Sequence, residues 1–171
     1  MDEVIISDYN PDWPQQFAEI AGRVRHAFAD GPLIAVEHIG STSIAGLAAK
    51  PIIDIDVIVP SETDVPDAIA RLATVGYVHQ GDNGIPGREA FQSPPGSPKH
   101  HLYLCLCDGL EYHRHIAFRD YLREHFEAAE HYEALKRDLA ARFRNDRVAY
   151  NDGKTTYIEA VVEKAREQQR G

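Results

Sequence analysis

Apolar residues in the first half of the chain recur with helical spacing in some segments and with strand spacing in others. In "WPQQFAEIAGRVRHAF" the apolar residues Phe17, Ile20, Val24 and Phe28 repeat every three or four positions, which predicts a helix. The runs "LIAVEHI" and "PIIDIDVIV" are rich in β-branched residues and predict strands. The elements expected here are a helix ending at Gly31-Pro32, a strand at 33–39, a short helix at 41–49, a strand at 51–59 and a helix at 64–76.

The second half of the chain contains one further strand region and is then helical. Residues 81–99 contain four Gly and four Pro, which predicts a long connection around one short strand at 88–92. The other elements expected are strands at 77–80 and 100–107, a turn at Asp108-Gly109, and helices at 111–125, 128–143 and 153–169. Because strands and helices alternate early, we expect an α/β (α+β) fold in one domain spanning residues 1–171: a small mixed β-sheet flanked by helices, with a helical C-terminal third.

Two aspartates interrupt the apolar strand at 51–59. Side chains alternate along a strand, so Asp54 and Asp56 share one face, roughly 7 Å apart, while Ile53, Ile55 and Val57 point into the core. Two adjacent carboxylates repel each other and resist desolvation, and a divalent cation offsets both effects. Carboxylate oxygens suit Mg²⁺ or Mn²⁺. The alternative is an edge strand with one wet face, but the nearly continuous apolar flanks favour the metal interpretation.

A glycine and a serine stand where the strand at 33–39 ends. Exposed N–H groups at such a turn can bind phosphate, the Ser41 hydroxyl can add a donor, and Gly40 lets the backbone approach a ligand closely. On its own a Gly-Ser turn is only a helix cap, supplied here by Ser41 or Thr42. Followed by the Asp-x-Asp strand, it predicts a phosphate-binding turn of Gly40, Ser41 and Thr42 beside a metal site.

The charge of the chain limits its partners. The net charge is −9: residues 1–110 hold 6 Lys/Arg against 15 Asp/Glu, and residues 111–171 hold 12 of each. Broad electrostatic binding of nucleic acid is therefore not expected, and a small anionic ligand needs its own cations. No apolar run reaches the roughly 20 residues of a membrane helix, and the acidic start lacks a signal-peptide pattern. We expect a cytoplasmic protein with no membrane partner, whose two cysteines, Cys105 and Cys107, are reduced thiols.

The strand, the Gly-Ser turn and the Asp-x-Asp strand together resemble the nucleotidyltransferase superfamily, the polymerase β-like fold. Residues 42–53 separate Ser41 from Asp54, close to the spacer of that superfamily. More narrowly, "EHIGSTSIAGLAAKPIIDIDV", "YNPDWPQQF", "HHLYL" and "AFRDYLREH" look like the GrpB family, a branch of the same superfamily, from about Tyr9 to Ala165. The resemblance implies the nucleotidyltransferase fold and leaves the substrate open.

Active members of that superfamily usually carry a third carboxylate on a later strand. The corresponding strand is "HHLYLCLC", where alternation puts His101 and Tyr103 on the less apolar face and places no acid there. His101 can serve as a nitrogen ligand or as a base near neutral pH, and in the GrpB pattern a histidine occupies this region. Asp108 and Glu111, just past the strand, are the other groups that can reach the site.

The cations available for a triphosphate are Lys50, Arg88, Arg114, Arg119 and Lys154. Two of them match segments of the family pattern: Arg119 in "FRDYL" and Lys154 in "YNDGKTTYIEAV", ahead of the last helix. The resemblance implies phosphate contacts for both, which suit an arginine fork and a lysine point charge. The alternatives are an ion pair of Arg119 with Asp120 or Glu124, and a surface position for Lys154.

Motif spacing argues against two other enzyme classes. A P-loop needs Gly, four residues and then Gly-Lys-Ser/Thr, but five residues separate Gly40 from Gly46 and no lysine follows Gly46, so a kinase is not expected. A zinc hydrolase would draw on the numerous histidines, but no His-Glu-x-x-His or comparable spacing connects them; we expect most to be structural: His38, His100, His101, His113 and His115.

Two hypotheses remain. The first is a metal-dependent nucleotidyltransferase that transfers a nucleotidyl group from a nucleoside triphosphate to an unknown small acceptor. In it, Asp54 and Asp56 hold Mg²⁺ (or Mn²⁺), His101 assists catalysis, and the loop at 81–99 shapes the acceptor pocket. The second is a nucleotide- or metabolite-binding module on the same fold that lacks catalysis because the third acid is missing.

Overall fold

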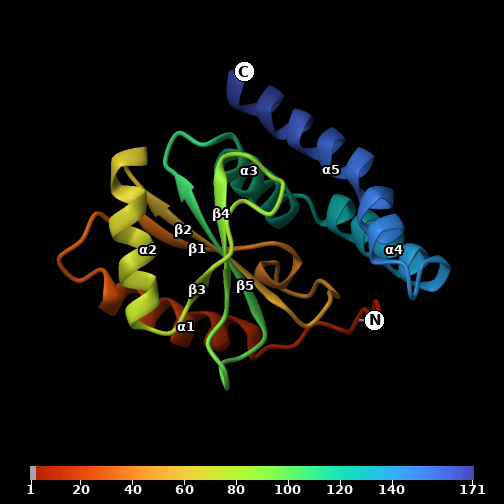
Figure 1. The fold of residues 1–171 in the computed structure, drawn as a ribbon. Helices are drawn as coiled ribbons and strands as arrows, with labels where there is room; N and C mark the ends of the chain where they lie inside the picture. The colour runs from red at the N-terminus through yellow and green to blue at the C-terminus, as the bar shows by residue number, and fades with distance from the viewer. Residues whose placement is uncertain (1–2) are drawn as a thin grey trace.

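The computed structural model describes residues 3–171 and contains a five-stranded mixed sheet with the strand order β1-β2-β5-β4-β3 (Figure 1). The strands are β1 (Ala35–Ile39), β2 (Ile53–Val59), β3 (Val78–His79), β4 (Arg88–Gln92) and β5 (His100–Leu106). β2 and β5 pair in parallel, and every other neighbouring pair is antiparallel. The expected mixed sheet is therefore confirmed, including the short strand within residues 81–99.

The helices lie on the two faces of this sheet. They are α1 (Trp13–Ala27), α2 (Val65–Thr74), α3 (Leu110–Glu124), α4 (Phe126–Arg142) and α5 (Arg147–Arg170). α1 and α2 lie together on one face and α3 lies on the other, while α4 and α5 pack against α3 to the right of the sheet in Figure 1, which confirms the helical C-terminal third. Across residues 3–171, none of these helices combines the length and apolar character that a membrane crossing requires.

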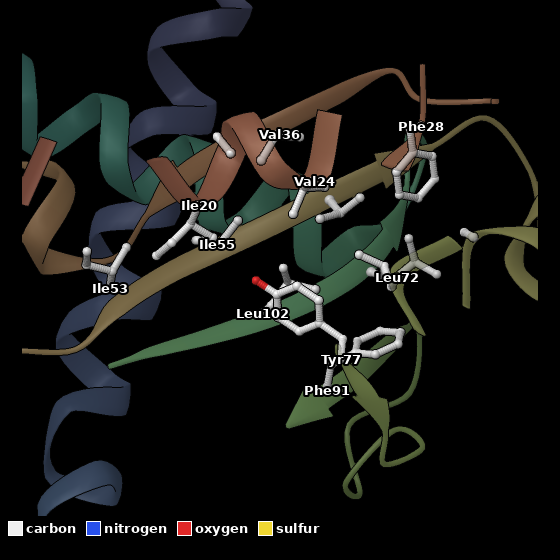
Figure 2. Packing of buried hydrophobic residues seen from close by; sticks show 14 of the residues in the cluster. Ile20, Val24, Phe28, Val36, Ile53, Ile55, Leu72, Tyr77, Phe91 and Leu102 are labelled. Carbon is white, nitrogen blue, oxygen red and sulfur yellow. The ribbon is translucent and has the colours of Figure 1, made fainter. Parts of the chain in front are cut away.

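The main core lies between the sheet and helices α1 and α2. Ile53, Ile55 and Val57 of β2 are each at most 1% exposed and belong to this core, as the alternation of the strand predicts. Figure 2 shows Ile20 and Leu72 among the apolar side chains that complete it. The second face of β2 therefore has to accommodate Asp54 and Asp56 under a different set of helices.

Strand register brings the polar residues of that second face together. Asp54 lies opposite His101 of β5, and Asp56 lies between Glu37 of β1 and Tyr103 of β5. Residues directly opposite one another in neighbouring strands point to the same face of a sheet. α3 contacts both β1 and β5, so its side chains cover this polar row.

The expected helix at 41–49 is wrong. Only one 3₁₀ turn forms there, η1 (Ser41–Ser43). Neither Ser41 nor Thr42 caps it: Gly40 occupies the N-cap position, and no side chain accepts a hydrogen bond from the N–H groups at the start of the turn. The following residues run as irregular chain: Ile44 is extended, Gly46 has a φ of +80°, and Ala49 pairs with Ser7 in an isolated antiparallel bridge. Tertiary pairing thus replaces the helix that the local sequence favours.

The last helix begins earlier than residue 153. α5 starts at Arg147, and the side chain of Asp146 caps it by accepting a 3.0 Å hydrogen bond from the N–H of Ala149. Gly153, expected to be the first residue of the helix, lies in its interior: a Cβ at this position would stand 2.5 Å from Leu139 of α4. The glycine is required by close helix packing, so Lys154 projects from within α5 rather than from its start.

From the description of the core we expect a buried and an exposed leucine to differ in their contribution to the free energy of unfolding. Leu72 in α2 is fully buried, whereas Leu110 at the start of α3 is 80% exposed. Leu72→Ala should lower the free energy of unfolding by about 2–5 kcal/mol, because it removes buried methyl groups and leaves a cavity. Leu110→Ala should change it by less than about 0.5 kcal/mol. Urea unfolding followed by circular dichroism measures both, and equal effects would contradict this description of the core.

Candidate functional site

The acid pair lies on an interior strand. β2 has β1 on one side and β5 on the other, so the alternative of a wet edge strand is wrong. The side chain of Asp56 is fully buried, and that of Asp54 keeps 32% of its surface exposed. A buried carboxylate needs a compensating partner. The two aspartates therefore differ: Asp54 faces an opening, and Asp56 lies behind it.

Each aspartate is hydrogen-bonded to a histidine. Nδ1 of His101 lies 2.9 Å from Oδ1 of Asp54, and Nδ1 of His115 in α3 lies 2.7 Å from Oδ2 of Asp56. Nε2 of His115 is in turn 3.6 Å from Oε2 of Glu111. Thus His101 takes the place expected for a third acid beside Asp54, while Glu111 contacts the site only through His115.

Burial and hydrogen bonding shift the protonation of the inner pair. Burial raises the pKa of Asp56, although its hydrogen bond to His115 opposes that shift. Burial by itself would lower the pKa of His115, but the hydrogen bond and negative charge of Asp56 outweigh it and raise the pKa. Both shifts act in the direction of the protonated form, because burial opposes the charge of Asp56 while that carboxylate favours the imidazolium of His115.

The turn after β1 packs directly against Asp54. Gly40 has a φ of +71°, and a Cβ at this position would lie 2.6 Å from Oδ2 of Asp54, so only glycine fits. Its carbonyl accepts a 2.5 Å hydrogen bond from the Ser43 hydroxyl. Ser41 and Thr42 line the same opening, but the hydroxyl of Thr42 is already within 2.9 Å of Nε2 of His38. The predicted turn and acid pair are therefore adjacent.

A cavity of about 320 Å³ opens beside this turn. Asp54, His101 and Tyr103 form its floor on the sheet, and residues of α3, α4 and α5 form its walls. Six cationic side chains line it: Lys50, Arg88, Arg114, Lys136, Arg147 and Lys154. In a chain of net charge −9, this is a local concentration of positive charge, which is what the binding of a small anion would require.

These cations are not neutralised by the protein. Within residues 3–171, only Arg114 among the six has a carboxylate oxygen within 4.0 Å, and that distance, to Glu111, is 3.8 Å. Several arginines elsewhere are paired: Arg71 lies 2.6 Å from Asp67, and Arg137 lies 2.7 Å from Asp8. The cavity is thus suited to a ligand that brings negative charge with it.

Two of the cavity lysines are held where burial opposes their charge. Burial, reinforced by the charge of Lys154, lowers the pKa of Lys136 to about 7. Burial, reinforced by the charge of Lys50, lowers the pKa of Lys154 to about 8. Lys136 donates to the carbonyl of Ala48 and lies 4.8 Å from the centre of the Tyr132 ring. An incoming anion would stabilise the charged form of both lysines.

Arg119 lies outside this cavity. Its guanidinium is 2.7 Å from Glu37 and 2.8 Å from Asp120, and it also donates to the carbonyl of His38. Arg119 therefore connects α3 to β1 next to Asp56. Of the two interpretations given for it from the sequence, the ion pair with Asp120 is the one observed. Of the loop at 81–99, only Arg88 lines the cavity.

The acid pair suits a metal that arrives with a ligand rather than one held in a protein cage. In residues 3–171 no three side chains of His, Cys, Asp or Glu form a metal-binding group, so the ligand set of a zinc hydrolase is missing there. Oδ1 of Asp56 is buried without a hydrogen-bond partner in that range. Mg²⁺ is commonly held by one or two carboxylates together with substrate phosphates, and Asp54 and Asp56 fit that mode.

His115 and Lys136 are the main site residues that the sequence did not single out. Each lies on the inward stripe of its helix: His115 precedes buried Phe118 by three positions, and Lys136 follows buried Tyr132 by four. A polar residue in register with an apolar stripe is the signal that would have identified them. His113, two positions from His115, is exposed, as helical geometry requires.

A model of the GrpB protein family matches residues 3–164 of the chain. The UPF0157 protein YqkA of Bacillus subtilis is 38% identical over 170 residues; the alignment covers 99% of this chain and 48% of YqkA, so the chain spans about half the length of that relative. The crystal structure of the conserved protein GrpB from Enterococcus faecalis superposes with a TM-score of 0.85 at 34% identity, covering 98% of this chain and 100% of that one.

A more distant likeness concerns the fold alone. The Cid1 poly(U) polymerase with Mg and 3′-dATP bound superposes with a TM-score of 0.58 at 13% identity, covering 86% of this chain and 49% of that one. The nucleotidyltransferase-like fold implied by the Gly-Ser turn and the Asp-x-Asp strand is therefore confirmed.

The lowered pKa of Lys136 should make the free energy of unfolding depend on pH in a defined direction. Its pKa is about 7 in the folded protein and about 10.4 when unfolded, so between these values the unfolded state binds the extra proton. The wild-type protein should therefore gain stability relative to Lys136→Met as pH rises from 7 to 9, at a rate approaching 1.4 kcal/mol per pH unit. Below pH 6 the difference should be constant.

Lys164→Met provides the matched control, because Lys164 is exposed on α5. Its stability difference from wild type should not change over the same pH range. Urea unfolding at several pH values measures both variants. A flat difference for Lys136→Met would show that Lys136 keeps its ordinary pKa.

Proposed function

The chain belongs to the GrpB family, and from that premise we propose that it is a metal-dependent nucleotidyltransferase that transfers a nucleotidyl group from a nucleoside triphosphate to a small acceptor. The observation that carries this proposal is the juxtaposition of the Asp54–Asp56 pair with a cavity of unneutralised cations beside the Gly40 turn. We place the reaction in the cytoplasm, where the free thiols of Cys105 and Cys107 remain reduced.

The phosphates of the nucleotide would lie between the turn and helices α4 and α5. Ser41 lines the cavity on one side, and Lys136 and Lys154 line it on the other. Lys154 and Lys50 both stand over the ring of Tyr150, at 4.4 and 5.0 Å from its centre. A triphosphate placed there would favour the protonated, charged forms of Lys136 and Lys154. Part of its binding energy would therefore offset the cost of keeping these two buried amines charged.

Asp54 and Asp56 would hold Mg²⁺ or Mn²⁺ together with oxygens of the bound triphosphate. When bound, such an ion neutralises the charge that develops on the phosphates during transfer. The protein's own contribution is to keep Asp56 buried with one oxygen, Oδ1, free of hydrogen bonds, and to keep Asp54 at the opening under Gly40.

His101 would accept the proton released during transfer. The acceptor hydroxyl oxygen forms a bond to the α-phosphorus, the bond from that phosphorus to the oxygen bridging the β-phosphate breaks, and pyrophosphate leaves with the electron pair. Because Nδ1 of His101 donates to the carboxylate of Asp54, Nε2 is the nitrogen able to take the hydroxyl proton. The carboxylate also stabilises the imidazolium that results.

A second candidate is a binding module without catalysis on the same fold. The observation in its favour is that both aspartates already bond to histidines and that His101 stands where active relatives of this fold usually have a third acid. Both candidates predict nucleotide binding, so only turnover separates them.

Turnover is tested by pyrophosphate release from ATP, GTP, CTP and UTP with Mn²⁺ and a panel of hydroxyl acceptors. We expect Asp54→Asn to lower the rate at least about 100-fold, since it removes one of two charges at the reacting phosphate. Asp120→Asn is the control, because Asp120 pairs with Arg119 outside the cavity; its rate should stay within about twofold. If wild-type protein binds nucleotide but turns over none of the panel, the binding module is the better description.

Nucleotide affinity tests the phosphate position separately. Lys154→Gln should weaken binding of a nucleoside triphosphate about tenfold or more, because it removes one charge-assisted hydrogen bond. Lys164→Gln, the same change at an exposed position of α5, should alter affinity by less than about twofold. Isothermal titration calorimetry gives both values, and equal affinities of the two variants would place the phosphates elsewhere.

A further inference from the structure

We propose that Arg88 and Arg114 form a second anion site within the cavity and that the acceptor carries a phosphate or carboxylate group which they bind. This inference rests on the proposed nucleotidyltransferase, whose acceptor class it names. It is argued from the position of the two arginines, from their free hydrogen-bond donors and from the charge that a bound triphosphate leaves unbalanced.

Arg88 is held on the sheet beside the acid pair. It lies in β4, and the centre of its guanidinium stands 4.0 Å from the centre of the Tyr103 ring. Tyr103 is the register partner of Asp56, so the guanidinium lies next to the reacting centre. Within residues 3–171 it makes no ion pair, and its buried Nε has no hydrogen-bond partner. Stacking thus orients the group while its donors stay uncommitted.

Arg114 approaches from the helix that covers the sheet. It lies in α3, one position before the His115 that binds Asp56, and it lines the cavity. Its shortest approach to a carboxylate in residues 3–171 is the 3.8 Å from Nη1 to Glu111, which is too long for a hydrogen bond. Arg114 therefore also keeps its donors available.

The remaining four cations come from other elements. Lys50 and Lys154 meet over Tyr150, and the charges of Lys50 and Lys154 both act to lower the pKa of Lys136. Arg147, at the start of α5, lowers the pKa of both Lys50 and Lys154. These four interact electrostatically with one another, and in the proposed function they bind the triphosphate. Arg88 and Arg114, from β4 and α3, would then remain without an anionic ligand. The carboxylates near them are Glu111, 3.8 Å from Arg114, and buried Asp56, whose charge interacts with Arg88.

The chemistry of the two arginines selects the missing group. A planar guanidinium binds phosphate or carboxylate oxygens in a bidentate manner, whereas it gains little from a neutral hydroxyl. A phosphate monoester carries about −1.5 to −2 at neutral pH and would balance the two arginines. Bound there, the anionic group of the acceptor would direct its hydroxyl toward His101 and Asp54, which line the same cavity.

The test measures binding of small probes to protein saturated with Mg²⁺ and a non-hydrolysable α,β-methylene nucleoside triphosphate. Glycerol 3-phosphate and ribose 5-phosphate supply the phosphate arm, glycerate supplies the carboxylate arm, and glycerol is the neutral control. We expect at least one anionic probe to bind while the analogue stays bound, and glycerol to bind at least tenfold more weakly. The arm that binds identifies the group.

Two variants connect this binding to the arginines. Arg88→Gln and Arg114→Gln should each weaken the anionic probe at least tenfold and leave the analogue's affinity within twofold. Arg88→Lys, which keeps the charge but not the fork, should give an intermediate affinity, and Arg166→Gln, on the exposed part of α5, should behave as wild type. Thermal unfolding of each variant establishes that it is folded.

Three results would overturn the anion site: displacement of the analogue by the anionic probes, failure of all anionic probes to bind, or equal weakening of probe and analogue by Arg88→Gln. Repeating the titrations without analogue separates the two proposals. If the analogue does not bind but glycerol 3-phosphate or glycerate still binds in an Arg88-dependent manner, the nucleotidyltransferase is refuted and the anion site stands. If the analogue binds and every anionic probe fails, the anion site alone is refuted.

Discussion

The hydrogen bond between the fully buried carboxylate of Asp56 and the imidazole of His115 is the interaction on which the site depends. A carboxylate inside an interior strand is costly unless it is paired, and the hydrogen bond from His115 supplies that partner. The same bond fixes α3 on the polar face of the sheet. That helix then carries Arg114 into the cavity and Arg119 onto β1, so the buried charge organises the elements that surround it.

The cavity favours ligand binding at the expense of the stability of the free protein. Lys136 is almost completely buried, its pKa is lowered to about 7, and its amine is satisfied by one backbone carbonyl. In contrast, several arginines on the outer surface are paired with nearby acids, as the contacts of Arg71 and Arg137 show. Mutual repulsion among the cavity cations persists until an anion enters.

Histidine in place of a third acid changes the chemistry that the fold can support. An imidazole beside Asp54 offers a nitrogen that can bind or release a proton, whereas a carboxylate at the same position would chiefly hold metal. In the proposed function, this nitrogen lies where the acceptor hydroxyl would approach. Two free arginines on the same side of the cavity are consistent with an acceptor that carries its own negative charge.

Periodicity alone predicts the strands, the polar face of β2 and the Gly40 turn, because alternation and glycine conformation are local properties of the chain. Strand alternation together with the family resemblance also indicates His101, and the resemblance indicates Lys154. Local sequence cannot decide the segment at 41–49, where pairing of Ala49 with Ser7 replaces a helix, or the start of α5, where Gly153 serves packing against Leu139. Local sequence also does not predict that Lys136 and His115 lie near the acid pair. These residues are about sixty to eighty positions away from the aspartates and become neighbours only when the helices pack on the sheet. The acids were visible in the sequence; the cations that surround them depend on the tertiary structure, because long-range packing alone sets which helix faces are buried.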